Sequence, residues 1–337
     1  MTISEVAKLA NVSKSTVSRV INKTGYVNEE TRKRVEKVIR ETNYSPSSLA
    51  RGLSKNETNY IGVVIPEIDN EFFSEILSGI NEGLDENDLT MICCDTNNNG
   101  KREQKALQML AQQRVKGVII TPAEEYQDNE ANSSLRAKLK KVNAPIVILD
   151  RHFSNTQWDG VFYDNFNSAY AAAEALINAG HQKIGIITGD LTLQIARERF
   201  DGFKQALKDY DVPLIEKYIY KGNFGIQRAY ELSKKMFESG DMPDGILTSN
   251  NRTSIGFVKA AKDCRIRIGV DIGVVGIDHV EMLDLLGYEL SCATRNTKKM
   301  GKTALDILLE RIANPDTGRK IIIVPYELNL KGSEKKQ

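Results

Sequence analysis

From residue 59 onward, short apolar runs recur along the chain, and segments with helical spacing of apolar residues separate them. The runs at 117–121 and 183–188 are typical, because each is almost continuously apolar and does not alternate with polar residues. Continuous apolar runs indicate parallel strands that helices cover on both faces. The sequence therefore predicts an α/β fold with parallel sheets for most of the chain.

The number of expected strands is large for a single open sheet, which usually has roughly four to six. Ten strands are expected, at 60–65, 89–94, 117–121, 145–150, 161–163, 183–188, 218–220, 245–248, 272–276 and 321–324. The sequence therefore predicts two α/β lobes.

Residues 1–46 have a different character, with three short helical segments. Thr2 and Glu5 have the spacing of a capping box, and apolar residues follow at helical positions as far as Ala10. Ser13 is a good N-cap for a second helix at 14–21, and a third helix is expected at about 28–42. Three short helices around a small core are typical of a helix-turn-helix DNA-binding domain.

The second helix is the candidate DNA-reading element, because its outer residues are short hydroxyls and cations. Such side chains bond base edges and phosphates in a major groove, and Arg19 can bond a guanine through two hydrogen bonds. The alternative is the solvated face of a small helical bundle. The candidate DNA-binding residues of this domain are Thr2, Ser13, Lys14, Ser15, Thr16, Ser18, Arg19 and Asn22.

The net charge of +1 is unevenly distributed. Residues 1–57 carry eleven Lys or Arg and six Asp or Glu, a net charge of +5, which leaves −4 for the rest of the chain. A basic head on a mildly acidic body predicts that only the head meets a polyanion.

Several other classes of protein are disfavoured by the sequence. The cysteines (Cys93, Cys94, Cys264 and Cys292) have no metal-binding spacing, so we expect buried thiols and no metal site. With neither a secretory signal nor an apolar run of the roughly 20 residues that a membrane helix needs, a cytoplasmic protein with no membrane partner is expected. Dinucleotide-loop, phosphate-loop, H-E-x-x-H and G-x-S-x-G motifs are missing, which argues against an enzyme and predicts no cofactor.

The segment ISEVAKLANVSKSTVSRVIN at 3–22 resembles the headpiece of the lactose/galactose repressor (LacI/GalR) family, and the match continues to NYSP at 43–46. The resemblance implies an all-α helix-turn-helix headpiece on an α/β two-lobed core like that of periplasmic binding proteins, with parallel sheets and three crossovers. It also implies a homodimeric repressor of carbohydrate-catabolism genes. Such a repressor would bind a pseudo-palindromic stretch of double-stranded operator DNA and respond to a sugar-type effector in the cleft.

The resemblance also sets the expected domain limits. These are a headpiece at 1–46, a hinge helix and linker at 47–57, and an effector-binding and dimerisation core at 58–337. Ala50 and Leu53 of the hinge match DNA-binding positions, with Leu53 as a wedge in the minor groove, although a linker packed on the core is the alternative. The expected crossovers lie near 159–161, 289–292 and 321–326. They give an N-lobe of about 58–160 with 292–321 and a C-lobe of about 161–290 with 322–331.

Ligands of parallel α/β sheets bind beyond the carboxyl ends of the strands, and the loops there are rich in carboxylates, amides and aromatic rings. By position, several of these residues match the family's effector pocket, including Phe166 as a stacking ring. Two residues depart from the family pattern, since Arg252 and Arg295 stand where many relatives have an apolar residue and a glutamine. The candidate effector-binding residues are Asn70, Phe72, Phe73, Arg151, Phe166, Arg199, Asn250, Arg252, Asp278 and Arg295.

Four of these candidates are arginines, which bind carboxylates and phosphates through paired hydrogen bonds. They predict an anionic effector such as a sugar acid or a sugar phosphate. The alternative is that some of them pair across the cleft with Asp150, Asp164, Asp190 or Asp278, which would leave room for a neutral sugar. A further alternative is a catabolite-control regulator driven by a protein co-effector.

Overall fold

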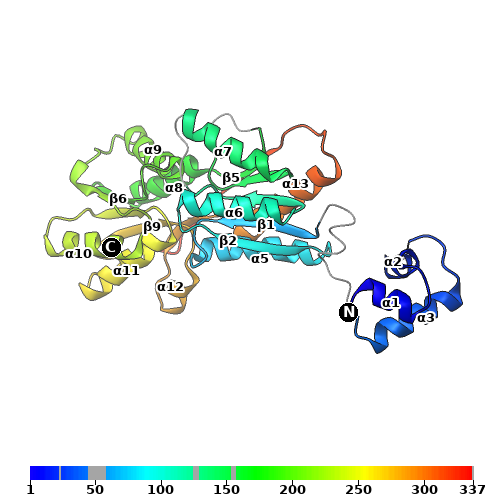
Figure 1. The fold of residues 1–337 in the computed structure, drawn as a ribbon. Helices are drawn as coiled ribbons and strands as arrows, with labels where there is room; N and C mark the ends of the chain where they lie inside the picture. Colours follow the sequence, from blue (N-terminus) through cyan, green and yellow to red (C-terminus); the bar gives the residue numbers. More distant parts are fainter. Residues whose placement is uncertain (23, 45–57, 124–128, 153–156, 336–337) are drawn as a thin grey trace. The chain divides into compact units, whose positions relative to one another are not determined.

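A computed structural model describes residues 1–22, 24–44, 58–123, 129–152 and 157–335 of the 337-residue chain, with the backbone alone at 129–132. The chain forms two compact units, Met1–Thr58 and Asn59–Gln337 (Figure 1). The predicted hinge residues Ala50 and Leu53 lie outside the described residues.

The first unit contains α1 (Ile3–Leu9), α2 (Lys14–Asn22) and α3 (Glu29–Glu41). Thr2 and Glu5 form the predicted capping box. The Ser13 Oγ accepts a hydrogen bond from the Thr16 N–H at 3.1 Å, so Ser13 caps α2. The core consists of small apolar side chains: Val6, Ala7, Ala10, Val17, Val20 and Val35. The three-helix headpiece is therefore confirmed.

The second unit contains two six-stranded sheets, which confirms the two-lobed α/β core. The first has the order β11 (Ile321–Val324), β5 (Asp159–Tyr163), β4 (Ile146–Leu149), β3 (Gly117–Ile120), β1 (Tyr60–Ile65), β2 (Thr90–Asp95). The second has the order β12 (Glu327–Asn329), β10 (Ser291–Thr294), β9 (Gly273–Ile277), β8 (Gly245–Thr248), β6 (Ile184–Thr188), β7 (Ile219–Lys221). Neighbouring strands are parallel except for β10 and β12.

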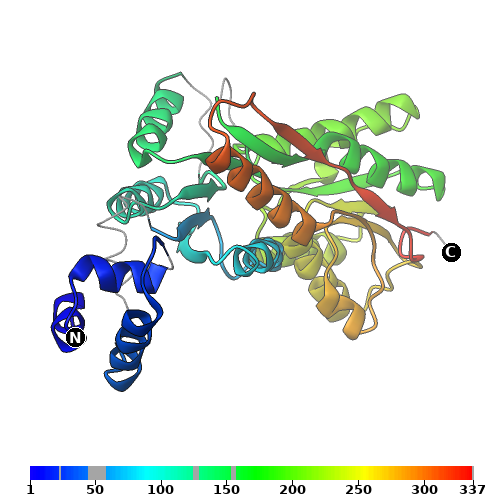
Figure 2. The ribbon, with the colours of Figure 1, turned by 90° about the vertical axis from the view of Figure 1, so that its right-hand side faces the viewer.

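Helices cover both faces of each sheet, as continuously apolar strands require. On the first sheet, α5 (Glu71–Asp85) and α13 (Thr297–Ala313) lie side by side on one face, and α6 (Gly100–Gln112) and α7 (Asn129–Val142) cover the other (Figures 1 and 2). On the second sheet, α8 (Asn165–Asn178) and α9 (Gln194–Asp209) cover one face, and α10 (Ile226–Glu238) and α11 (Asn251–Asp263) the other. The short helices are η1 (Glu216–Tyr218) and α12 (Glu281–Leu285), and no described helix is long and apolar enough to cross a membrane.

The chain passes between the sheets at residues 164, 295–296 and 325–326. The first two crossovers lie later in the chain than the sequence predicts, because β5 and β10 run their full length before the chain leaves the sheet. Residues 161–163 and 322–324 therefore belong to the first lobe, where β11 pairs with β5, and 292–294 belong to the second. Two strands were missed, because β10 is built of small residues and β12 is short and largely exposed.

The edge strand β2 corrects the expectation of four buried thiols. Its free edge leaves its side chains partly accessible, and Cys93 is exposed. Cys94 and Cys264 are half-buried, and only Cys292 is fully buried. The expectation is therefore confirmed for Cys292 in the covered strand β10 and is wrong for Cys93 in the edge strand β2.

Candidate functional sites

A cavity of about 510 Å³ lies between the two lobes. Its walls come from segments that directly follow strands, β1 to β4 in the first lobe and β6 to β10 in the second, which is where parallel sheets bind ligands. The lining residues are Glu67, Asn70, Phe72, Phe73, Asn98, Ala123, Asp150, Arg151, Asp190, Thr192, Leu193, Ile195, Arg199, Asn223, Phe224, Asn250, Asn251, Asp278 and Arg295.

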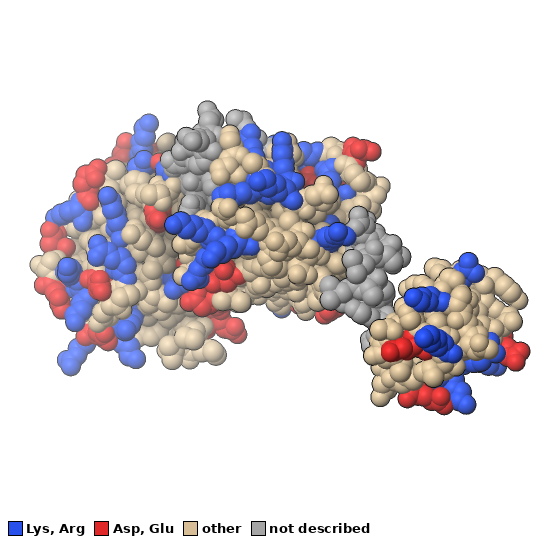
Figure 3. Space-filling view, viewed as in Figure 1, with Lys and Arg blue, Asp and Glu red and all other residues tan. Residues whose placement is uncertain are grey.

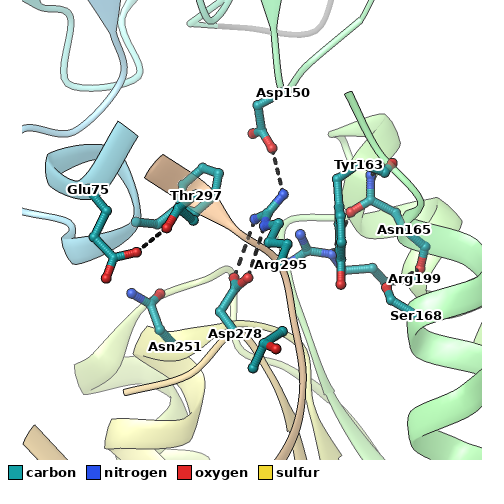
Figure 4. A network of polar contacts seen from close by, with 12 residues as sticks. Glu75, Asp150, Tyr163, Asn165, Ser168, Arg199, Asn251, Asp278, Arg295 and Thr297 are labelled. Carbon is teal, nitrogen blue, oxygen red and sulfur yellow. Dashed lines mark hydrogen bonds and ion pairs between the residues drawn. The ribbon is translucent and has the colours of Figure 1, made fainter. Parts of the chain in front are cut away.

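Arg295 connects the two lobes within this cavity (Figure 4). Its Nη1 lies 3.0 Å from Asp150 Oδ1 in the first lobe, and its Nε lies 3.0 Å from Asp278 Oδ1 in the second. The guanidinium carbon also lies 3.8 Å from the ring centroid of Phe72 and 4.3 Å from that of Tyr163. Burial by itself lowers the pKa of Arg295, but the two carboxylates raise it above its ordinary value. The charge of Arg295 is therefore compensated by the protein itself.

The two carboxylates that hold Arg295 have an unusual backbone conformation. Asp150 has a φ of 61° and Asp278 a φ of 67°, in the left-handed region that residues other than glycine rarely adopt. Each follows a central strand of its lobe. Such conformations persist only where the surrounding structure imposes them, so the fold fixes the direction of both carboxylates.

Arg199, on α9, is buried but has different partners. Its Nε donates to Asn165 Oδ1 at 2.8 Å and its Nη1 to the Ser249 carbonyl at 2.6 Å. Among the described residues, no carboxylate lies within ion-pair distance of this guanidinium. Burial, and then repulsion by Arg295, lower the pKa of Arg199, which is the opposite of the shift at Arg295.

Arg151 places a second such cation on the wall formed by the first lobe. Its Nη1 donates to Asn98 Oδ1 at 2.8 Å and to the carbonyls of Ala123 and Pro122 at 3.1 and 3.2 Å. Its buried Nε has no hydrogen-bond partner in the described part of the chain, where it also lacks an ion pair. Burial lowers the pKa of Arg151. Each lobe thus presents one guanidinium that has no carboxylate within ion-pair distance among the described residues.

Three further polar contacts join the lobes around the cavity. They pair residues of the first lobe with residues of the second: Glu67 with Arg252 at 3.1 Å, Asn70 with Asn251 at 3.0 Å, and His152 with Glu198 at 3.2 Å. In this structure the protein's own side chains hold the two walls together. Among the described residues, no cluster of His, Cys, Asp and Glu could hold a metal ion.

In the headpiece, α2 presents a polar outer face without an acidic residue. Lys14, Ser15, Arg19 and Asn22 are exposed, while Thr16 and Ser18 are half-buried. The Ser13 Oγ lies 2.7 Å from the Ser15 Oγ and 2.9 Å from the Thr16 Oγ1, and Asn22 Nδ2 donates to the Ser18 Oγ at 3.2 Å. The Thr2 side chain is engaged in the cap of α1. The face combines two exposed cations with a chain of linked hydroxyls, which suits a phosphate backbone and base edges.

Residues 2–47 match the family described as "Bacterial regulatory proteins, lacI family", and residues 58–332 match "Periplasmic binding proteins and sugar binding domain of LacI family". This chain belongs to the LacI family.

Two curated relatives of this LacI-family chain are repressors. It is 33% identical to the HTH-type transcriptional repressor PurR of Mannheimia succiniciproducens over 99% of each chain. It is 30% identical to the ribose operon repressor of Haemophilus influenzae, over 96% of this chain and 95% of the relative. A crystal structure of the Lac repressor dimer bound to operator and the anti-inducer ONPF matches 99% of each chain with a TM-score of 0.87 and 25% identity. The LacI-family chain is thus a transcriptional regulator and not an enzyme.

Eight of the ten predicted effector-binding residues line the cavity, and two do not. Phe166 is 37% exposed on the first turn of α8, because its neighbours Asn165 and Ser168 take the inward positions. Arg252 lies at the rim, where it pairs with Glu67 and lies 3.6 Å from Asp69. Both residues are therefore corrected to positions outside the lining. The predicted alternative, in which arginines pair across the cleft, holds for Arg295, which pairs with two of the expected aspartates. It also holds for Arg252, but its partner is Glu67, which was not among the expected residues.

Several lining residues were missed, and Phe224 is the most informative of them. It follows β7, has a φ of 56°, and its ring centroid lies 5.7 Å from the Arg199 guanidinium carbon. Phe224 thus lines the cavity with an aromatic ring, the position predicted for Phe166. The signal was present, since 222–225 directly follow a predicted strand, but β7 is short and its carboxyl end did not stand out. Glu67, Asn98 and Asn251 also follow strands and could have been found by the same rule.

Proposed function

We propose that this LacI-family protein is a homodimeric repressor that binds a pseudo-palindromic operator with its α2 helices, in the cytoplasm. The exposed cationic and hydroxyl face of α2, on a head with a net charge of +5, supports DNA binding. The similar Lac repressor was solved as a dimer bound to operator. Met282, Leu285 and Leu286, which are 65%, 80% and 65% exposed, offer an apolar patch that a second copy would cover.

The effector that we propose is a small polyhydroxylated anion, a sugar acid or a sugar phosphate, bound between the lobes. The observation that carries this proposal is the contrast among the cavity's arginines, because Arg151 and Arg199 have no carboxylate partner among the described residues while Arg295 has two. A buried cation without a counter-charge is unfavourable, and a carboxylate or phosphate group would offset that cost. Arginine binds such groups through paired hydrogen bonds.

The rest of the cavity suits hydroxyl groups and a sugar-sized ligand. Asp190, Asn98, Asn223 and Asn250 offer acceptors and donors, and the half-buried Phe224 offers a ring face. A volume of about 510 Å³ lies within the range of small-molecule sites. A ligand that contacts Arg151 in one lobe and Arg199 in the other would favour one lobe arrangement over others, which is the basis of allosteric control.

A second candidate is a neutral sugar. Asp190 lines the cavity without an ion pair among the described residues, and a carboxylate of this kind accepts hydrogen bonds from sugar hydroxyls. The Haemophilus influenzae relative is a ribose operon repressor. A protein co-effector is the third possibility, and a pull-down from lysate with full-length protein would detect it.

Calorimetry with the full-length protein separates the first two candidates. The probes are D-gluconate and D-glucose 6-phosphate as anions, and D-glucose and D-ribose as neutral sugars. We expect at least one anion to bind about tenfold or more tightly than either neutral sugar, which corresponds to about 1.4 kcal/mol. Arg151→Gln should abolish that difference. Tight binding of a neutral sugar together with no binding of either anion would refute the anionic effector.

A parallel selection of random duplexes with the full-length protein tests the DNA-binding proposal. We expect recovered sequences to share a near-palindrome, and replacement of Leu53 by Ala to weaken binding to it more than binding to random DNA. Equal loss on both kinds of DNA would contradict the predicted wedge.

A further inference from the structure

On the first lobe, α6 and the carboxyl-terminal part of α7 are strongly basic, although the body as a whole carries a net charge of −4. Figure 3 shows Lys and Arg side chains gathered over these two helices. The segment 124–130 carries four acids, Glu124, Glu125, Asp128 and Glu130, whereas residues 100–123 and 133–145 contain nine basic residues and a single acid, Glu103. That acid is buried and accepts a hydrogen bond from the Ala123 N–H at 2.7 Å, so it does not offset the surface charge.

Four of these lysines lie at the amino-terminal edge of the first sheet, where the linker from the headpiece enters the body. The Lys116 N–H donates to the carbonyl of Tyr60, the first residue of β1, at 2.8 Å. Lys138, Lys140 and Lys141 lie at the end of α7, just before β4, which runs parallel to β3 and β1. Lys140 and Lys141 are exposed, Lys116 and Lys138 are half-buried, and none of the four has an ion pair among the described residues. We call Lys116, Lys138, Lys140 and Lys141 the linker-end lysines.

We propose that the linker-end lysines bind the phosphate backbone of the DNA that flanks the operator. The inference rests on the proposed DNA binding by the headpiece. Only sixteen residue steps separate Tyr44 from Tyr60, which limits their separation to about 55 Å for a fully extended chain. A duplex held by the head therefore lies within reach of this edge of the body, and its phosphates form a dense row of negative charge. Lysines without ion-pair partners contribute most to the free energy of DNA binding, because each contact with a phosphate releases condensed counterions and breaks no existing ion pair.

The charge of this edge is one-sided, which favours a specific orientation of the duplex. Asp85 and Asp88 lie near the end of α5 and the start of β2, on the other side of the same edge, and Glu86 beside them pairs with Lys302 at 3.6 Å. DNA would be attracted along the α7 side and repelled from the α5 side. Charged side chains that served only to keep the protein soluble would not need to be separated by sign in this way.

The test compares salt dependence for the wild type and a quadruple variant in which the linker-end lysines become glutamine. Binding of full-length protein to random-sequence duplexes is measured by fluorescence anisotropy. The duplexes have about 20 base pairs, enough for two half-sites, or about 60 base pairs. On the long duplex, the variant should lose about 2 to 4 from the slope of log K against log salt, and about tenfold or more in affinity near 100 mM salt. On the short duplex its affinity should stay within about twofold of the wild type.

A matched control removes four exposed lysines of the second lobe, Lys208, Lys221, Lys235 and Lys262. Three of them lie in the last turn of a helix, as Lys140 and Lys141 do, so the control also accounts for favourable interactions with helix carboxyl ends. The control should keep the wild-type slope, and a variant with four lysine-to-arginine changes at the linker-end positions should keep it too. An unchanged slope in the glutamine variant, an equal loss in the control, or an equal loss on both duplexes would overturn the proposal. Absence of wild-type binding to either duplex would instead refute DNA binding itself.

Discussion

The headpiece and the body place their candidate functional side chains in opposite environments. On α2, Lys14, Ser15 and Arg19 are exposed, and the core beneath them is built from other residues. In the cavity, Arg199 is 2% exposed and the Arg295 side chain 3%, and both take part in the packing of the body. Function and stability are thus carried by separate residues in the head and by shared residues in the body. Substitutions should therefore separate the two properties in the head and change both together in the body.

The largest effect on stability should come from Arg295→Gln. This change leaves Asp150 and Asp278 buried without a counter-charge, which we expect to lower the free energy of unfolding by about 3–5 kcal/mol, measured by urea denaturation. Adding Asp150→Asn and Asp278→Asn to the same chain should restore part of the loss. A loss below about 1 kcal/mol would mean that the bridge is not structural, and the contrast with the head would weaken.

Arg199→Gln should have a smaller effect on stability. Its guanidinium makes two hydrogen bonds but no ion pair among the described residues, so we expect a loss of about 1–3 kcal/mol in the same urea experiment. Calorimetry should show loss of effector binding in the same variant. If Arg199→Gln proved as destabilising as Arg295→Gln, an unrecognised counter-charge would have to be present.

The contact between His152 and Glu198 predicts a pH dependence of the free energy of unfolding, and we expect this effect to be smaller than those of the two arginine substitutions. Burial raises the pKa of Glu198, but hydrogen bonds from His152, Asn165 and Gln194 outweigh it and hold this pKa below the usual 4.5. The unfolded state therefore binds the proton more readily, so the stabilisation is fully present above pH 4.5 and is lost as the pH falls through the folded pKa. Urea midpoints measured below pH 4.5 should depend less on pH in Glu198→Gln than in the wild type. The exposed Glu216→Gln serves as the control and should keep the wild-type dependence.

The smallest effect on stability is expected for Arg19→Gln in the headpiece. Because Arg19 is exposed and outside the core, the free energy of unfolding should change by no more than about 0.5 kcal/mol. Affinity for the selected operator should nevertheless fall by about 1–3 kcal/mol, since Arg19 is the candidate for a bidentate guanine contact. Arg34→Gln, a change of equal charge on the exposed face of α3, should affect operator binding less. Equal losses for the two variants would show that Arg19 contributes only charge.

Local signals were sufficient for the headpiece. The capping box of Thr2 and Glu5, the cap at Ser13 and the helical spacing of the valines each act within a few residues of the chain, so the sequence predicts the three helices and the outer face of α2. In the body, the continuous apolar runs predict the covered parallel strands. The same signal does not predict β10, which is built of small residues, or β12, which is largely exposed.

For the cavity, the sequence by itself determined which loops follow strands, and those loops contain six of the predicted lining residues, while Arg199 and Arg295 were predicted from the resemblance to the family. Only the tertiary structure decided which arginines are compensated. The pairing of Arg295 with Asp150 and Asp278 joins positions that lie 145 and 17 residues away along the chain, and it depends on two crossovers and two left-handed aspartates. Charge compensation is a matter of a few ångströms between side chains from different lobes. No local pattern in the sequence encodes that distance, so only the folded chain shows that Arg151 and Arg199 are the cavity's arginines without an ion pair among the described residues.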